Sequence, residues 1–275
     1  MHRHRGGSSP IRYQPKSILL IRHGERLDHV DEEFARTNPR PHDGPLTSRG
    51  ADAAQLLGQK LRRWASVTDP VEEVLILTSP LYRCVETAHN IALGLVQGDE
   101  ALLRRVKLQV NESLVEGAYW MSKDVYRNEE YVVSRSFPFP VYYSAAEHPA
   151  RSHGLHLLPV HLTLGCAPSY WLETEQKLRL REELSVGRRC ERGANALFRC
   201  SAVHGKVVIL VGHGETTHLW FNGISSVPTE DHPDYLGVAE LVPRTDGRDG
   251  SVCWVPTFEP FQCIHTLTDD GMDDK

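Results

Sequence analysis

The sequence has no apolar run approaching the roughly 20 residues that a helix needs to cross a bilayer, so we expect no membrane contact. It also has no excess of positive charge. Its 31 basic residues are outnumbered by 36 acidic ones, the formal charge is −5, and nothing here favours nucleic-acid binding. Residues 1–16 are basic and rich in Gly, Ser and Pro but lack the apolar stretch of a signal peptide, and we interpret them as a flexible leader. Any anion site must therefore be a local cluster of cations.

Cysteine and histidine motifs that bind metals are also missing. The six cysteines are scattered without a Cys-x-x-Cys pair, which favours reduced thiols and a cytoplasmic location over a disulfide framework. Fifteen histidines suggest a metal site at first sight. However, no His-Glu-x-x-His occurs, and the histidines between 148 and 161 lack the helical spacing of ligands. We therefore expect no metal and no other cofactor.

Apolar segments of strand length recur along the chain. Three are near-continuous runs, typical of strands buried on both faces, and a fourth alternates like a half-exposed strand. These segments lie at 17–21, 74–77, 207–211 and 106–110, and two more strands are expected at 236–241 and 251–255. Because amphipathic helices separate the apolar runs, the pattern predicts an α/β fold with three α/β/α layers and a mainly parallel central sheet. A single domain over residues 17–275 would hold this fold.

The helices are predicted from apolar residues at intervals of three or four. Thr47 would cap one helix, and Ser79 would cap the next, with Pro80 at its first position. The segment 27–46 contains several prolines and is expected to be a loop.

The second half of the chain is less regular. Residues 117–169 combine prolines with aromatic residues, which favours a long insertion packed over the rest of the domain. Residues 170–201 have a helical composition that Gly187 and Gly193 are expected to break or weaken. A short helix is expected near 219–221.

Residues suited to phosphate chemistry follow the carboxyl ends of the three apolar runs. Arg22 and His23 follow the first, Arg83 lies in the first turn of the helix after the second, and His213 follows the third. Because parallel strands end at one edge of a sheet, these side chains should meet there. Arginine forks match phosphate oxygens, and a neutral imidazole can attack phosphorus. The sequence therefore predicts a phosphate site.

Longer motifs surround these residues, and they occur in a fixed order. They are Arg22-His23-Gly24-Glu25-Arg26, Pro45-Leu46-Thr47-Ser48-Arg49-Gly50, the segment 79–88, and Gly212-His213-Gly214. This series resembles the motifs of the histidine phosphatase superfamily, in its phosphoglycerate mutase-like branch. The sequence segments 83–91 and 36–38 are most similar to the phosphatase domain of the ubiquitin-associated and SH3 domain-containing suppressors of T-cell receptor signalling. They also resemble the ecdysteroid phosphate phosphatase relatives of that family.

The resemblance implies a metal-independent phosphomonoester hydrolase that forms a phosphohistidine on His23. Glu116 would be the general acid, although Glu112, one helical turn away, remains an alternative. His213 would be a third catalytic residue that donates to the developing charge. The phosphate would be held by Arg22, Arg26, Arg83 and His213.

Two other functions are compatible with the same residues. A mutase would transfer phosphate within its substrate through the same intermediate, and a catalytically silent module would only bind phosphate. The segment 117–169 departs from the relatives, so it leaves the substrate open between a phosphorylated small molecule and a phosphotyrosine protein. By analogy with the relatives, we expect a homodimer.

Overall fold

The computed structural model describes residues 13–37, 44–64, 73–79, 81–116, 156–157, 182–246 and 250–263. The predicted insertion at 117–169 lies outside these residues apart from a two-residue strand, and so does most of the predicted leader. No described helix is long and apolar enough to pass through a bilayer. Five of the six cysteines are described, and these five are free thiols.

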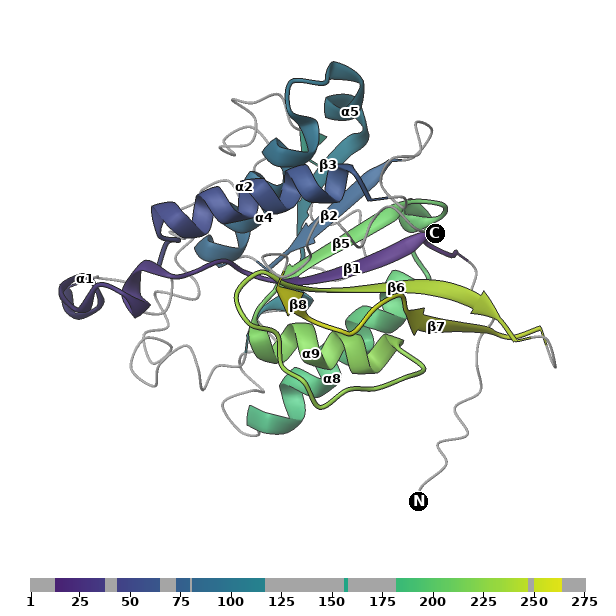
Figure 1. Cartoon of the computed structure of the whole chain (residues 1–275). Helices are drawn as coiled ribbons and strands as arrows, with labels where there is room; N and C mark the ends of the chain where they lie inside the picture. Colours follow the sequence, from purple (N-terminus) through teal and green to yellow (C-terminus); the bar gives the residue numbers. More distant parts are fainter. Residues whose placement is uncertain are drawn as a thin grey trace.

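The described residues form an eight-stranded sheet with the order β4-β3-β2-β5-β1-β6-β7, in which β8 pairs with β6 (Figure 1). Neighbouring strands from β4 to β1 are parallel, whereas β6 pairs antiparallel with β1, β7 and β8. The predicted mainly parallel α/β sheet is therefore confirmed. The strands are β1 (Ser17–Arg22), β2 (Val74–Thr78), β3 (Val106–Val110), β4 (His156–Leu157), β5 (Val207–Gly212), β6 (Gly237–Thr245), β7 (Val252–Pro256) and β8 (Gln262–Cys263).

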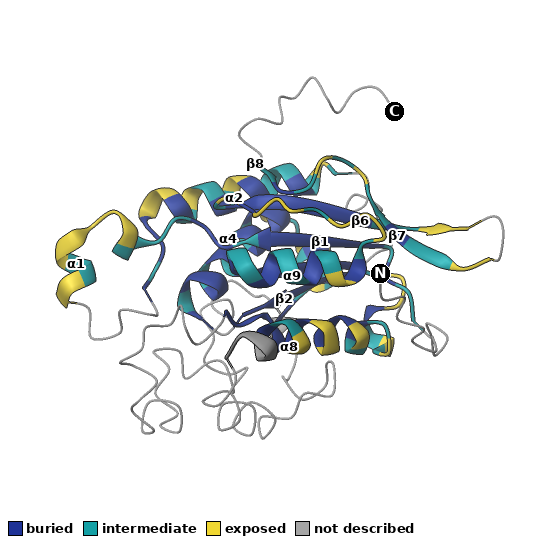
Figure 2. Ribbon diagram, turned by 90° about the horizontal axis from the view of Figure 1, so that it is seen from below, coloured by how far each residue is buried: buried dark blue, intermediate teal, exposed yellow. Residues whose placement is uncertain are grey.

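Helices cover both faces of this sheet, as the three-layer prediction required (Figures 1 and 2). On one face lie α2 (Ser48–Arg62), α4 (Tyr82–Val96) and α5 (Glu100–Arg105), and on the other lie α8 (Glu182–Leu197) and α9 (Gly214–Ile224). The run within β1 is apolar throughout because its side chains alternate between two cores, one on each face of the sheet. Leu19 and Ile21 join the first core, while Ile18 and Leu20 join the second.

The two predicted helix caps have different outcomes. Thr47 does cap α2, since its side chain accepts a hydrogen bond from the backbone N–H of Gly50 at 2.8 Å. Ser79 is not the N-cap of α4, because that helix begins at Tyr82 after an N-cap at Leu81. The Ser79 hydroxyl instead lies 2.8 Å from Nε2 of His213. The hydroxyl also accepts from the N–H of Leu81 at 3.4 Å, but its shorter contact is the tertiary one.

The expectation of a plain loop over 27–46 is wrong in part. This segment contains the 3-10 helix η1 (Leu27–His29) and the helix α1 (Glu32–Thr37), which lies exposed at one end of the molecule (Figure 2). The carboxylate of Asp31 accepts from the N–H of Phe34 at 2.8 Å, which stabilises the start of α1. Arg36 and Thr37 are exposed on α1, and Asn38 lies outside the described residues.

The predicted break of the helix in 170–201 is also wrong, because α8 continues through Gly187 and Gly193. Tertiary packing explains the difference. A Cβ at Gly193 would lie 2.4 Å from Cζ2 of Trp220 and 2.7 Å from Oγ of Ser113, so this glycine lets α8 approach α9 closely. The helix near 219–221 is longer than expected and begins at Gly214, where the N–H of His213 donates to Oγ1 of Thr216 at 3.1 Å.

The two glycines of α8 provide a matched pair of variants. We expect Gly193→Ala to lower the free energy of unfolding by about 1–3 kcal/mol, because the methyl group would overpack against Trp220. Gly187→Ala should raise it by about 0.5–1 kcal/mol, since a Cβ there meets no atom within 4 Å beyond its own helix among the described residues, and alanine favours the helix. Urea denaturation of both variants checks this, and equal midpoints would contradict it.

Candidate active site

Three neighbouring parallel strands, β2, β5 and β1, end level with one another. The next residues along the chain are Ser79, His213 and His23, which the register therefore brings side by side. Backbone hydrogen bonds continue past the strand ends. The N–H of His23 donates to the carbonyl of Gly212 at 2.9 Å, and that of Ser79 donates to Val211 at 2.9 Å. Sheet geometry thus fixes the backbone of the candidate site.

His23 is held as a neutral ring with one nitrogen committed. It is 2% exposed, and its Nδ1 lies 2.8 Å from the carbonyl oxygen of Gly24. A carbonyl oxygen only accepts, so Nδ1 carries the proton and Nε2 keeps its lone pair. Burial, together with the charges of Arg83 and Arg22, holds the pKa of His23 well below its usual value. The residue therefore presents a nucleophilic nitrogen at neutral pH.

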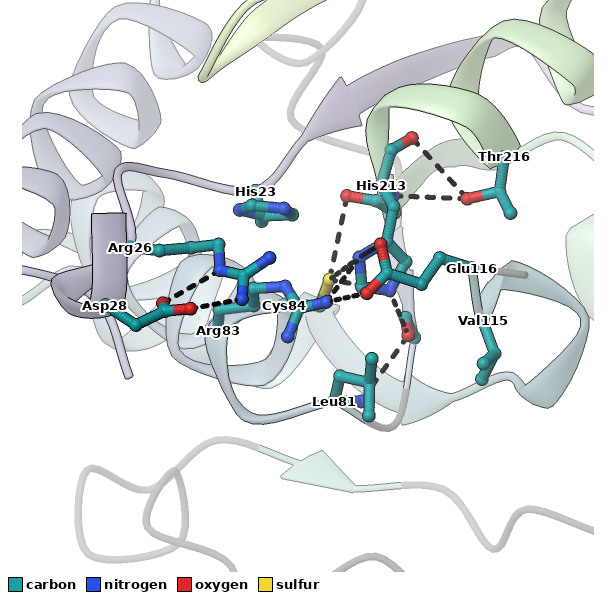
Figure 3. Close-up of polar contacts among 12 residues, drawn as sticks. His23, Arg26, Asp28, Leu81, Arg83, Cys84, Val115, Glu116, His213 and Thr216 are labelled. Atoms are coloured by element: carbon teal, nitrogen blue, oxygen red, sulfur yellow. Dashed lines mark hydrogen bonds and ion pairs between the residues drawn. The ribbon is translucent and has the colours of Figure 1, made fainter. Parts of the chain in front are cut away.

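The side chain of Arg83, in the first turn of α4, has no exposed surface, and Figure 3 shows it pointing toward Glu116. One of its nitrogens, Nη2, contacts Oε1 of Glu116 and lies 3.2 Å from Nδ1 of His213. A cation at the positive end of a helix dipole, out of reach of water, needs a nearby anion. Glu116, which is 9% exposed, supplies one in this structure. The same position is suited to an oxyanion.

His213 precedes α9 directly, and both of its ring nitrogens have partners. Nε2 lies 2.8 Å from Oγ of Ser79, and Nδ1 faces Arg83. Because a guanidinium only donates, the neutral ring accepts at Nδ1 and donates from Nε2 to Ser79. Sγ of Cys84 lies 3.5 Å from Nε2. Burial, with Arg83 and His23 nearby, holds the pKa of His213 well below its usual value.

Two further arginines border His23, and both lower the pKa of its ring. Arg22 donates from Nη1 to the carbonyl of Pro233 at 2.9 Å. Arg26 pairs with the carboxylate of Asp28, with Nε 2.9 Å from Oδ1 (Figure 3). Internal partners thus hold both guanidinium groups close to the nucleophilic ring.

The structure therefore brings the predicted site residues together from separate segments of the chain. The centroids of the His23 and His213 rings lie 5.3 Å apart, and Glu116 contacts Arg83 beside them. The side chain of Glu112 is outside what the structure describes, so its role as the alternative acid stays a prediction. The converging residues are Arg22, His23, Arg26, Arg83, Glu116 and His213.

Sequence reasoning missed a buried arginine that holds the backbone of Glu116. Arg189 of α8 is 4% exposed, and its Nη2 donates to the carbonyl of Val115 and, at 3.4 Å, to that of Glu116. It stands beside Arg188 on a helix with a polar composition, and no local pattern distinguishes the two. Only the packing of α8 against the strand ends identifies Arg189.

The chemistry of this cluster is that of an oxyanion site. Cationic groups and helix N-termini converge on a neutral imidazole, with one carboxylate beside them. Among the described residues, no group of three or more histidine, cysteine, aspartate or glutamate side chains is arranged to hold a metal ion.

Comparisons with known proteins agree with this arrangement. Residues 18–117 match the model of the histidine phosphatase superfamily (branch 1). Ubiquitin-associated and SH3 domain-containing protein B of Mus musculus is 31% identical over 136 residues, which cover 40% of this chain and 20% of the relative. Its Homo sapiens counterpart is 30% identical over 136 residues, which cover 40% of this chain and 19% of that protein. The matches span about a fifth of the length of these relatives.

Two solved structures share the fold. The ecdysone phosphate phosphatase of Bombyx mori, in complex with tungstate, gives a TM-score of 0.52 at 17% identity and covers 90% of this chain and 94% of its own. A mycobacterial glucosyl-3-phosphoglycerate phosphatase with bound VO3 gives a TM-score of 0.50 at 14% identity. The match covers 90% of this chain and 100% of that protein's chain. The predicted fold and the predicted resemblance to the histidine phosphatase superfamily are confirmed.

The buried histidines should make stability depend on pH. The pKa values of His23 and His213 lie well below 6.5 in the folded protein, whereas both return to about 6.5 on unfolding. Below about pH 6.5 the unfolded chain therefore binds protons that the native state does not. As the pH is lowered below about 6.5, the free energy of unfolding should therefore decrease, by up to about 1.4 kcal/mol per pH unit for each histidine.

Urea denaturation between about pH 7 and about pH 5 checks this dependence. We expect the wild-type midpoint to fall, and to fall less steeply in a His23→Asn, His213→Asn double variant. A wild-type midpoint that stays constant over this interval would rule the explanation out.

Proposed function

We propose that this chain is a phosphatase that hydrolyses phosphomonoesters through a phosphohistidine on His23. The observation that carries the proposal is the contact of Arg83 with Glu116 and His213 beside the neutral ring of His23. The superfamily match over residues 18–117 supports the same reaction class.

The first step would form a bond between Nε2 of His23 and phosphorus. The hydrogen bond from Nδ1 to Gly24 stabilises the positive charge that develops on the ring. Arg83 and Arg22 would hold the equatorial oxygens, where negative charge is largest. Nε of Arg22 is buried and has no hydrogen-bond partner among the described residues, so it has a donor available for such an oxygen.

Glu116 would give its proton to the leaving oxygen as the ester bond to phosphorus breaks. In this structure its carboxylate contacts Arg83, and a phosphate dianion would compete for that guanidinium. The proposed mechanism requires Glu116 to carry a proton once the phosphate has taken its place on Arg83. After transfer, the carboxylate would take a proton from the water that attacks phosphorus. The nitrogen–phosphorus bond then breaks, and phosphate and neutral His23 are released.

The positive charges in this reaction come from side chains, so we propose that it needs no added metal. The proposed substrates are phosphorylated small molecules or phosphotyrosine proteins. The cytoplasmic location and the homodimer stay predictions.

Hydrolysis of para-nitrophenyl phosphate in the presence of EDTA tests the proposal. We expect turnover by the wild type and a loss of at least about 10³-fold in kcat for His23→Ala, because the nucleophile is removed. His204→Ala replaces an exposed histidine outside the candidate site and should keep wild-type activity. An acid-labile phosphoenzyme should form in the wild type and not in His23→Ala. Full activity of His23→Ala would refute the proposal, and phosphate transfer without release would indicate a mutase.

The proton transfer predicts a dependence on the leaving group. Glu116→Gln should lower kcat by about 10²- to 10⁴-fold for an alkyl phosphate, which needs an acid, and much less for para-nitrophenyl phosphate. Arg189→Met should also lower kcat more for the alkyl phosphate than for para-nitrophenyl phosphate. Its loss in kcat for the alkyl phosphate should be only about tenfold, because the substitution frees the backbone of Glu116 without removing its carboxyl group. Arg188→Met, on the same helix but exposed, is the control and should resemble the wild type. Equal losses for both esters would argue against general acid catalysis by Glu116.

A further inference from the structure

Tyr235 lies at the candidate site although no motif in the sequence includes it. Its ring centroid is 4.5 Å from Cζ of Arg22 and 5.6 Å from the centroid of the His23 ring. Its hydroxyl forms a hydrogen bond with Nδ1 of His29. One aromatic side chain thus contacts both the predicted nucleophile and a predicted phosphate-binding arginine.

The position of the Arg22 side chain depends on residues 225–236, the segment between α9 and β6 that carries Tyr235. Its guanidinium lies over the Tyr235 ring and donates to the carbonyl of Pro233 at 2.9 Å. Its Cζ is also only 3.6 Å from the point where a Cβ on Gly214 would stand. A cation held over a ring and largely shielded from water is attracted to that ring more strongly than at an exposed site. These contacts leave the edge of the guanidinium, where its N–H groups lie, as the part that can meet an anion.

His23 is confined by rings as well as by its hydrogen bond to Gly24. The His213 ring meets it edge-on at 5.3 Å, and the Tyr235 ring lies tilted against it at 5.6 Å. An attack on phosphorus requires Nε2 to point along the bond that forms. The Tyr235 ring therefore limits the orientations that the nucleophile can adopt.

The backbone next to Tyr235 adopts a costly conformation. Leu236 has a φ of 57°, in the left-handed region that a leucine rarely enters. Its N–H lies 3.2 Å from the carbonyl oxygen of Arg22 and 3.4 Å from that of His23. Such strain persists where surrounding contacts impose it, and here those contacts join this segment to the site residues.

The rest of the segment is anchored to α9. The amide of Asn222 donates to the carbonyl of Thr229 at 2.9 Å and accepts from its N–H at 2.9 Å. Nδ1 of His218 lies 2.8 Å from the carbonyl of Asp231, and its ring stacks on that of His232 with centroids 4.2 Å apart. A segment fixed at both ends can hold Tyr235 in place.

From this geometry we infer that Tyr235 is a positioning residue, which orients the guanidinium of Arg22 toward the bound phosphoryl group and restrains the ring of His23. The inference rests on the proposed function and deepens it. The aromatic ring carries the effect, because the ring and not the hydroxyl contacts both residues.

Two substitutions separate the ring from the hydroxyl. Tyr235→Phe keeps the ring and loses only the bond to His29, so its affinity for tungstate and its kcat/KM should stay within about twofold of wild type. Tyr235→Leu removes the ring and should weaken tungstate binding by about 5- to 30-fold, with a loss in kcat/KM of at least that size. Tyr13→Leu removes a tyrosine ring that packs on His204 instead and should change neither quantity.

Tungstate affinity is measured by calorimetry, which needs no turnover, and thermal melting shows whether each variant folds. Tyr235→Met replaces the leucine variant if that one fails to fold. In an Arg22→Met background, Tyr235→Leu should cause a smaller further loss of tungstate affinity than it causes in the wild type, because only its contact with His23 remains, whereas a general structural defect would add its full effect.

The outcomes distinguish the two proposals. If the wild type hydrolyses para-nitrophenyl phosphate but Tyr235→Leu binds tungstate as tightly as wild type, the inference about Tyr235 is wrong and the phosphatase proposal stands. If the wild type binds tungstate in a Tyr235-dependent way without turnover, the inference holds and the phosphatase proposal fails. A loss in Tyr235→Phe equal to that in Tyr235→Leu would overturn the role of the ring.

Discussion

The site depends on the burial of the Arg83 guanidinium, which has no exposed surface at the N-terminal end of α4. Moving a charge out of water costs several kcal/mol unless partners compensate for it. Here Glu116 compensates with a carboxylate, and His213 accepts through Nδ1. Burial, together with the same charge, keeps His23 and His213 neutral by lowering their pKa values. This buried cation therefore contributes to the neutral state of both rings and also creates a position suited to anions.

The arrangement requires the strand order as much as the residues. Strands β2, β5 and β1 are adjacent because β5, which follows β3 and β4 along the chain, lies between β2 and β1 in the sheet. On the opposite face, the glycine at 193 lets α8 pack closely against Trp220 and Ser113. That close approach brings Arg189 to the backbone of Glu116. Packing on the far side of the sheet thus supports the residue proposed to move the proton.

Residues outside the recognisable motifs complete the surroundings of the site. The segment before β6 contributes Pro233 and Tyr235, both in contact with Arg22, and the segment after β1 contributes His29. These contacts lie around Arg22 and His23 rather than around Glu116, the residue proposed to exchange protons.

The sequence alone was sufficient to predict the α/β fold, the strands at 74–77 and 207–211, and the convergence of Arg22, His23, Arg83 and His213 at the strand ends, whereas Arg26 and Glu116 were added from the family resemblance. Apolar runs and residues that directly follow a strand are local features, and the sheet places them in the same way in many proteins. The cap at Ser79, the break at Gly193 and the roles of Arg189 and Tyr235 depended on partners more than 25 residues away. Local preferences of about 1 kcal/mol decide such positions only when no tertiary contact outweighs them. In this protein the hydroxyl of Ser79 binds His213, and Gly193 packs against Trp220, so the tertiary structure decided both.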